Sequence, residues 1–142
     1  MRQDRNEGSR RAVFGNCVIA MKHILIVDDV STNLKCAGLI LENRYKVTTV
    51  KSGREALECL NDSMIDLVLL DIRMNEMDGY EVMMRMKSNP KTADIPVILL
   101  TADTDQESER RGFALGAADY IGKPVEPQIL LDRIEAVWDV EE

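Results

Sequence analysis

The chain has 142 residues, of which 45% are apolar and 30% are charged, a composition typical of one globular domain. Its net charge of −7 argues against direct nucleic-acid binding, which normally uses a basic surface. No apolar stretch approaches the ~20 residues that span a bilayer, so we expect no membrane contact. The three cysteines form no Cys-x-x-Cys pattern, and we expect reduced thiols in a cytoplasmic protein.

Residues 1–20 are interpreted as an N-terminal extension and residues 21–142 as the folded domain. The extension has arginines ahead of about ten weakly apolar residues, an arrangement that resembles the start of a signal peptide. Gly15 and Asn16 interrupt that stretch, and this disfavours a signal peptide. Met21 stands just before the first strong strand pattern.

From His23 onward, strand-like and helix-like segments alternate. Short apolar runs rich in valine, isoleucine and leucine are typical of buried strands, and the predicted strands are 23–27, 46–50, 66–70, 96–101 and 119–121. Apolar residues at helical spacing and capping signals predict the helices between them, which are 32–43, 52–61, 78–88, 105–115 and 126–140.

Three helix boundaries carry explicit signals. Ser52 followed by Glu55 is a capping box, and Asp78 followed by Glu81 resembles one. Gly116 suits the end of the fourth helix. Five alternating strand-helix units predict an α/β fold with one doubly wound, five-stranded parallel sheet covered by five helices on its two faces.

Polar side chains follow four of the predicted strands. Asp28 and Asp29 end the first strand, Asp71 ends the third, Thr101 and Ala102 end the fourth, and Lys123 follows the fifth by two residues. In open α/β sheets the ligand crevice lies beyond these carboxyl ends. Each residue alone has an ordinary structural explanation, such as a helix cap or a solvated surface group.

Together these residues form a chemical unit. Clustered carboxylates repel one another unless a cation lies between them, and oxygen ligands suit Mg²⁺. A lysine and a hydroxyl beside such an ion can hold the oxygens of a phosphoryl group.

The segments "IVDD", "LLDIRMNEMDG", "VILLTA" and "GAADYIGKP", in this order and spacing, resemble the CheY-like receiver domain of two-component response regulators. The resemblance covers residues 22 to about 140. It implies the flavodoxin-like strand order 2-1-3-4-5. It also implies a phosphorylatable signalling switch rather than an enzyme.

The resemblance assigns a role to each residue at the strand ends. Asp71 would be the phosphoacceptor, which takes a phosphoryl group from a histidine kinase, a histidine phosphotransfer protein or a small phosphodonor. The implied ligands of Mg²⁺, or of Mn²⁺ in its place, are Asp28, Asp29, Asp71 and the backbone carbonyl of Arg73. The implied phosphoryl-binding residues are Thr101, Ala102 and Lys123, the switch residues are Thr101 and Tyr120, and the Lys123–Pro124 peptide bond is expected to be cis.

The implied output is a change of the 105–140 surface. That surface would bind a downstream protein target or a fused output domain, or mediate dimerisation. The segment 103–112 is polar all round and contains Gly112, so we expect a helix that is mobile compared with its neighbours. Movement of Thr101 toward the phosphoryl group would let Tyr120 turn inward.

Two positions depart from the family pattern. Asn75 stands where the family very often has proline, which predicts a less rigid loop after the site. Arg73 projects a large cation toward the mouth of the site.

Two other functions remain open at this point. A degenerate receiver would act as a constitutive binding module. An enzyme of another class would be flavodoxin-like or a phosphohydrolase, although no Gly- or Thr-rich phosphate loop follows the first strand. A haloacid-dehalogenase-like enzyme would need Asp-x-Asp there, and the chain has adjacent Asp28 and Asp29.

We predict that residues 1–20 are dispensable for phosphorylation, since they supply none of the expected site residues. A truncated protein that starts at Met21 should accept a phosphoryl group from acetyl phosphate and Mg²⁺ at the rate of the full chain, measured by intact-mass spectrometry. Loss of Mg²⁺-dependent phosphorylation in the truncated protein would show that the extension contributes to the site.

Overall fold

The predicted apolar runs form one parallel sheet. The computed structural model describes residues 11–14, 17–102 and 105–141. Its five-stranded sheet has the order β4-β3-β5-β6-β7, with every neighbouring pair parallel, which confirms the expected order. The strands are β3 (His23–Val27), β4 (Lys46–Val50), β5 (Leu67–Asp71), β6 (Val97–Thr101) and β7 (Asp119–Gly122).

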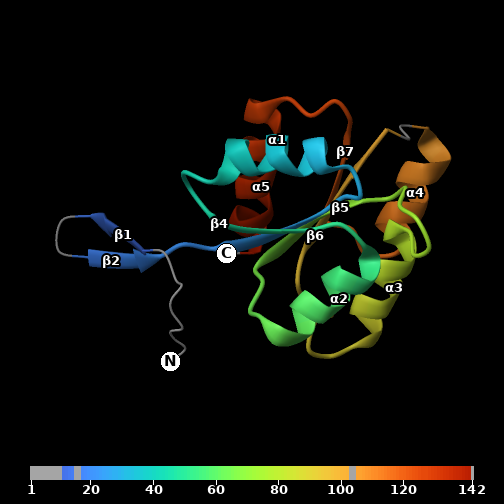
Figure 1. Ribbon diagram of the computed structural model, residues 1–142, viewed down its shortest axis with the longest axis horizontal. Helices are drawn as coiled ribbons and strands as arrows, with labels where there is room; N and C mark the ends of the chain where they lie inside the picture. The colour runs from blue at the N-terminus through green and yellow to red at the C-terminus, as the bar shows by residue number, and fades with distance from the viewer. Residues whose placement is uncertain (1–10, 15–16, 103–104, 142) are drawn as a thin grey trace.

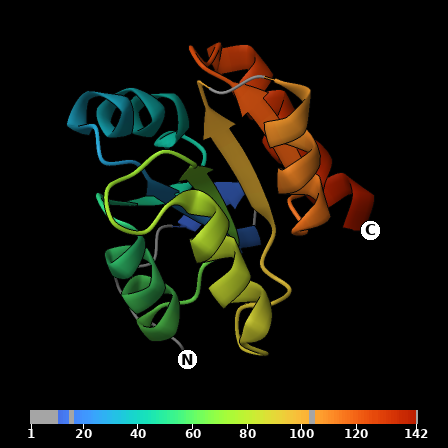
Figure 2. The ribbon, with the colours of Figure 1, turned by 90° about the vertical axis from the view of Figure 1, so that its right-hand side faces the viewer.

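Five helices cover the two faces of this sheet, as the alternating pattern predicts. They are α1 (Ser31–Leu41), α2 (Gly53–Asp62), α3 (Gly79–Ser88), α4 (Gln106–Ala114) and α5 (Pro127–Glu141). Figure 1 shows α1 and α5 on one face and α2 and α3 on the other. Figure 2, turned by a quarter of a circle, shows the orange α4 beside the end of the sheet that β6 and β7 form.

Alternate residues of each strand face opposite layers of helices. In β3, Leu25 and Val27 pack toward α2 and α3, whereas Ile24 and Ile26 pack toward α1 and α5. The residues of β5 are all buried, and each fully buried aliphatic side chain contributes about 1.5–3 kcal/mol. The two cores hold the strands firmly, so the residues at the strand ends are placed with little freedom.

The predicted caps of α2 and α3 are present. The Ser52 hydroxyl accepts a hydrogen bond from the backbone N–H of Glu55, and the Asp78 carboxylate accepts one from the N–H of Glu81. The Glu55 carboxylate reaches back to the N–H of Lys51 at 3.0 Å. The bonds to the N–H groups of Glu55 and Glu81 satisfy donors that a helix start otherwise leaves unpaired.

Some boundaries differ from the prediction by one or two residues. β5 continues through Asp71, one residue beyond the predicted end, because Asp71 still pairs with Leu100 of β6. α1 ends at Leu41 rather than at residue 43. The backbone N–H groups of Arg44 and Tyr45 both bond to the Leu41 carbonyl, which closes the turn there.

The predicted extension contains a β-hairpin that the sequence interpretation omitted. β1 (Arg11–Phe14) pairs antiparallel with β2 (Cys17–Ala20) in a separate two-stranded sheet. Valine, isoleucine and phenylalanine on either side of a Gly-Asn pair are a recognised hairpin pattern. Among the described residues, no helix has the length and hydrophobicity to cross a membrane.

Candidate functional site

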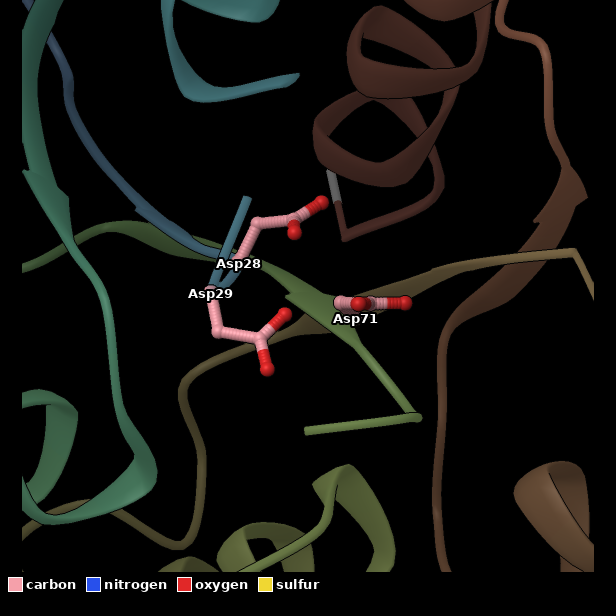
Figure 3. A group of neighbouring side chains, drawn as sticks. All are labelled: Asp28, Asp29 and Asp71. Carbon is pink, nitrogen blue, oxygen red and sulfur yellow. The ribbon is translucent and has the colours of Figure 1, made fainter. Parts of the chain in front are cut away.

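The register of the sheet brings three carboxylates to one edge. Val27 of β3 pairs with Leu70 of β5, so the residues that follow them, Asp28 and Asp71, lie beside each other. One carboxylate oxygen from each of Asp28, Asp29 and Asp71 lies within 4.8 Å of the others. Figure 3 shows the three side chains at the ends of the two neighbouring strands. Asp28 and Asp71 are only 4% and 6% exposed.

Lys123 reaches the same site from the end of β7, the edge strand of the sheet. Its backbone N–H donates to the Thr101 carbonyl at 2.8 Å, and the Lys123–Pro124 peptide bond is cis, as the resemblance implied. The Lys123 Nζ donates to an oxygen of Asp28 at 2.7 Å and lies 3.4 Å from an oxygen of Asp71. One ammonium group therefore faces two nearly buried carboxylates.

The two aspartates after β3 are also fixed by amide groups. The Asp28 carboxylate accepts from the backbone N–H of Val30 at 2.9 Å and from the Asn33 side-chain amide at 3.1 Å. Asp29 accepts from the backbone N–H of Asn75 at 3.3 Å. The bond from Asn75 is one that proline, the usual residue of the family here, could not donate.

Asn33 is a site residue that the sequence interpretation missed. It lies in the first turn of α1, which follows β3 directly, and its amide points back to the strand end. The available signal was its position: a polar residue in the first turn of the helix after the Asp pair can reach that pair.

The remaining predicted residues surround this cluster. Thr101, which is 0% exposed, ends β6 next to β5. Ala102 and Lys123 line a cavity of about 480 Å³ between α1 and the start of α5. Arg73 is exposed and lines a second cavity, of about 620 Å³, with Asp29 and Asn75. The role of the Arg73 carbonyl stays a prediction.

Tyr120, in β7, is 8% exposed. Its ring lies against that of Phe113, with 6.5 Å between the centroids.

Burial raises the pKa of Asp71 from 3.8 to about 6. Lys123 opposes that shift, whereas the charges of Asp28 and Asp29 add to it. The cluster thus combines hard oxygen donors with an excess of negative charge, which is the chemistry of a site for a divalent cation. The three aspartates could hold such an ion.

We predict that Asp71→Asn stabilises the protein at pH 7.5 in the presence of EDTA. An unfolded chain releases the Asp71 proton near pH 4, whereas the folded chain releases it near pH 6. The folded state therefore disfavours the carboxylate, and this destabilisation is complete above pH ~6 and disappears as the pH falls to ~4. The substitution should raise the free energy of unfolding by about 1–3 kcal/mol at pH 7.5 and by much less at pH 4.

Urea denaturation followed by the fluorescence of Trp138, the single tryptophan, measures this difference. Asp94→Asn is the matched control, because Asp94 is exposed and outside the cluster. An equal gain at both pH values would contradict the proposed cause, as would no gain at either.

Comparison with known proteins identifies the family. The family model of the response regulator receiver domain matches residues 24–135. A Vibrio cholerae protein named "Probable cyclic di-GMP phosphodiesterase" is 49% identical over 111 residues, which are 78% of this chain and 25% of that protein. The response regulator SaeR of Staphylococcus aureus is 42% identical over 115 residues, 80% of this chain and 49% of SaeR. The chain thus matches a quarter to a half of the length of these relatives.

Comparison with solved structures indicates the same family. The chemotaxis protein CheY4 of Vibrio cholerae has a TM-score of 0.79 at 30% identity, over 83% of this chain and 99% of CheY4. The chain keeps the flavodoxin-like strand order, but the family match replaces the interpretation as a flavin protein or a phosphohydrolase. The chain belongs to the response regulator receiver domain family, whose members are phosphoacceptor switches of two-component signalling.

Proposed function

We propose that Asp71 is the residue of this receiver that is phosphorylated, in a Mg²⁺-dependent transfer from a phosphohistidine of a sensor histidine kinase or a histidine phosphotransfer protein. The observation that carries the proposal is the place of Asp71. Its carboxylate ends a fully buried strand, 3.4 Å from the Lys123 ammonium and within 4.8 Å of Asp28 and Asp29. Small phosphodonors such as acetyl phosphate would serve the same reaction.

The transfer makes one bond and breaks one. A carboxylate oxygen of Asp71 attacks the phosphorus, and the P–N bond to the donor histidine breaks. Its electron pair stays on the imidazole nitrogen, and the product on Asp71 is an acyl phosphate. Attack needs the ionised carboxylate, and with a pKa of about 6 most of the Asp71 population is ionised at pH 7.5.

The proposed ligands of the metal ion are Asp28, Asp29, Asp71 and the backbone carbonyl of Arg73. A bound Mg²⁺, or Mn²⁺, would supply positive charge to the oxygens of the incoming phosphoryl group. Lys123 would move its ammonium from the carboxylates to a phosphoryl oxygen, and Thr101 would donate its hydroxyl to another. Ala102 has a small side chain beside this position and leaves room for the phosphoryl group.

A protein donor has a surface to pack on next to this chemistry. The cavity of about 480 Å³ has Asp28 and Lys123 at one end and apolar residues of α1, β6 and α5 along its walls. Val30, at the start of α1, is 47% exposed. Apolar contacts from a donor helix here would hold its histidine over Asp71.

The proposed output is a population shift at the 105–140 surface. When Thr101 turns toward the phosphoryl group, the buried position of Tyr120 becomes more favourable than an outward one. The packing of α4 on β7 then changes. This surface would bind a downstream protein or a fused output domain, or a second copy of the chain, without direct nucleic-acid contact, in the cytoplasm.

We predict that Asp71→Asn abolishes phosphorylation by acetyl phosphate and Mg²⁺, because the amide is nearly isosteric with the carboxylate and is not a nucleophile. Intact-mass spectrometry should detect one added phosphoryl group in the wild-type protein and none in the variant. Asp94→Asn should incorporate it at the wild-type rate. Full incorporation into Asp71→Asn would rule out Asp71 as the acceptor.

We predict that Asp29→Asn weakens Mg²⁺ binding by about ten-fold or more, since a charged ligand is lost. The Mg²⁺ concentration that gives half-maximal phosphorylation should rise by that factor, and excess Mg²⁺ should restore the rate. An unchanged Mg²⁺ dependence would remove Asp29 from the ligand set.

A further inference from the structure

α4 is the helix with the fewest buried residues. Of its nine residues, only Gly112 is buried. A Cβ atom at Gly112 would lie 2.6 Å from the Leu99 side chain and 3.4 Å from the Tyr120 ring, so this glycine lets α4 approach the sheet closely. A helix with one buried position needs other contacts to hold its place.

A residue of α3 supplies two of those contacts. The Tyr80 hydroxyl donates a hydrogen bond to the backbone carbonyl of Ser108, in the first turn of α4, at 3.0 Å. The Arg111 guanidinium lies over the Tyr80 ring, 4.0 Å from its centroid, a cation–π geometry. Tyr80 is only 6% exposed, whereas Ser108 is half-buried and Arg111 is exposed, so the two contacts lie where the buried phenol meets the surface.

Tyr80 is itself joined to the phosphoacceptor strand by short backbone contacts. The N–H of Gly79 donates to the Ile72 carbonyl at 2.8 Å. A Cβ atom at Gly79 would lie 2.5 Å from the Asp71 carbonyl oxygen and 2.9 Å from the Ile72 Cα. Asp78, one residue earlier, caps α3. Because Gly79 contacts residues 71–72 so closely, a displacement of the backbone there would also displace Gly79 and its neighbour Tyr80.

Open space lies around this connection. The cavity of about 620 Å³ is bounded by Arg73 and Asn75 of the site loop, by Tyr80, and by Ser108 and Arg111 of α4. A second cavity, of about 570 Å³, lies along α3 and shares Tyr80 and Arg111 with the first. The site loop and the first turn of α4 thus have room to move relative to each other, with Tyr80 between them.

From these contacts we infer that Tyr80 is a positioning residue that ties α4 to the phosphoacceptor strand and carries movement of that strand end to α4. This connection is separate from the one through Thr101 and Tyr120. The inference rests on the proposed function, because the movement it transmits is the one that follows phosphorylation of Asp71. It makes the response of α4 depend on a phenol oxygen that is no part of the phosphoryl site.

Tyr80→Phe tests the connection, since it removes the hydroxyl and keeps the ring. Tyr45→Phe is the matched control: Tyr45 is 8% exposed and its ring contacts that of Trp138 in a tilted geometry, on the α1 and α5 side of the sheet. Hydrogen exchange in residues 106–115, without metal or phosphoryl analogue, should be about five-fold faster in Tyr80→Phe, the effect of one lost hydrogen bond. Tyr45→Phe should leave exchange in this segment unchanged.

The second measurement repeats the exchange with Mg²⁺ and beryllofluoride. In the wild type, protection should change both at the site loops and in residues 106–115. In Tyr80→Phe the change at the site loops should persist, and the change in 106–115 should fall to less than half. Acetyl phosphate should phosphorylate both proteins to the same extent.

A second pair of variants tests the ring contact. Arg111→Gln should speed exchange in 106–115 in the same direction. Arg110→Gln, which removes the neighbouring arginine paired with Glu107, should have little effect on exchange in 106–115. Equal effects of the two substitutions would overturn the role of the Tyr80 ring.

The inference is overturned if exchange in 106–115 is the same in Tyr80→Phe and the wild type, or if the full response to beryllofluoride persists there in the variant. Failure of the proposed function has a different signature. In that case neither protein responds at the site loops and neither takes up a phosphoryl group, whereas the effect of Tyr80→Phe on exchange in the metal-free protein remains measurable.

Discussion

The repulsion among three carboxylates at the carboxyl ends of two neighbouring strands is the constraint on which this structure depends. Water would normally screen such charges, but Asp28 and Asp71 are nearly buried, and one lysine serves both. Burial is the main cause of the raised pKa of Asp71, and the charges of Asp28 and Asp29 add to it. The site is therefore prepared for added positive charge before any phosphoryl group arrives, because a cation relieves strain that the folded chain already carries.

The unfavourable charge is confined to the end of β5, and the residues of that strand below it are tightly packed. β5 is buried along its whole length between two layers of helices, and its rigidity fixes the direction of the Asp71 carboxylate. The opposite condition holds at α4, which has a single buried glycine and a few specific contacts. Chemistry on the rigid strand and movement in the weakly held helix require these two different kinds of packing.

The sequence was sufficient for the parts that local rules govern. Continuous apolar strands predicted a sheet covered on both faces, and the Ser52 and Asp78 caps were read directly from residue types. The strand ends identified the cluster because a parallel sheet brings its carboxyl ends together. The strand order itself came from the family resemblance. The hairpin was missed because the interruption at Gly15 and Asn16 was treated only as evidence against a signal peptide.

Contacts between distant segments could not be predicted in this way. The bond from the Tyr80 phenol to the Ser108 carbonyl depends on where α3 and α4 lie after packing. The polar character of 103–112 predicted weak anchoring of the fourth helix, but not which residue would anchor it. Likewise Asn75 was noted as a missing proline, whereas its N–H supplies a bond to Asp29.

The Tyr80 hydroxyl donates its hydrogen bond to a backbone carbonyl of α4, a group that any residue at position 108 would present. Since this bond and the close approach at Gly112 hold the helix in place, most side chains on the outer face of α4 have no structural role. Positions such as Glu109 and Arg110 are exposed and can drift in sequence while the helix keeps its place. Substitutions at such positions would change the surface that α4 presents while leaving the side chains of the aspartate cluster unaltered.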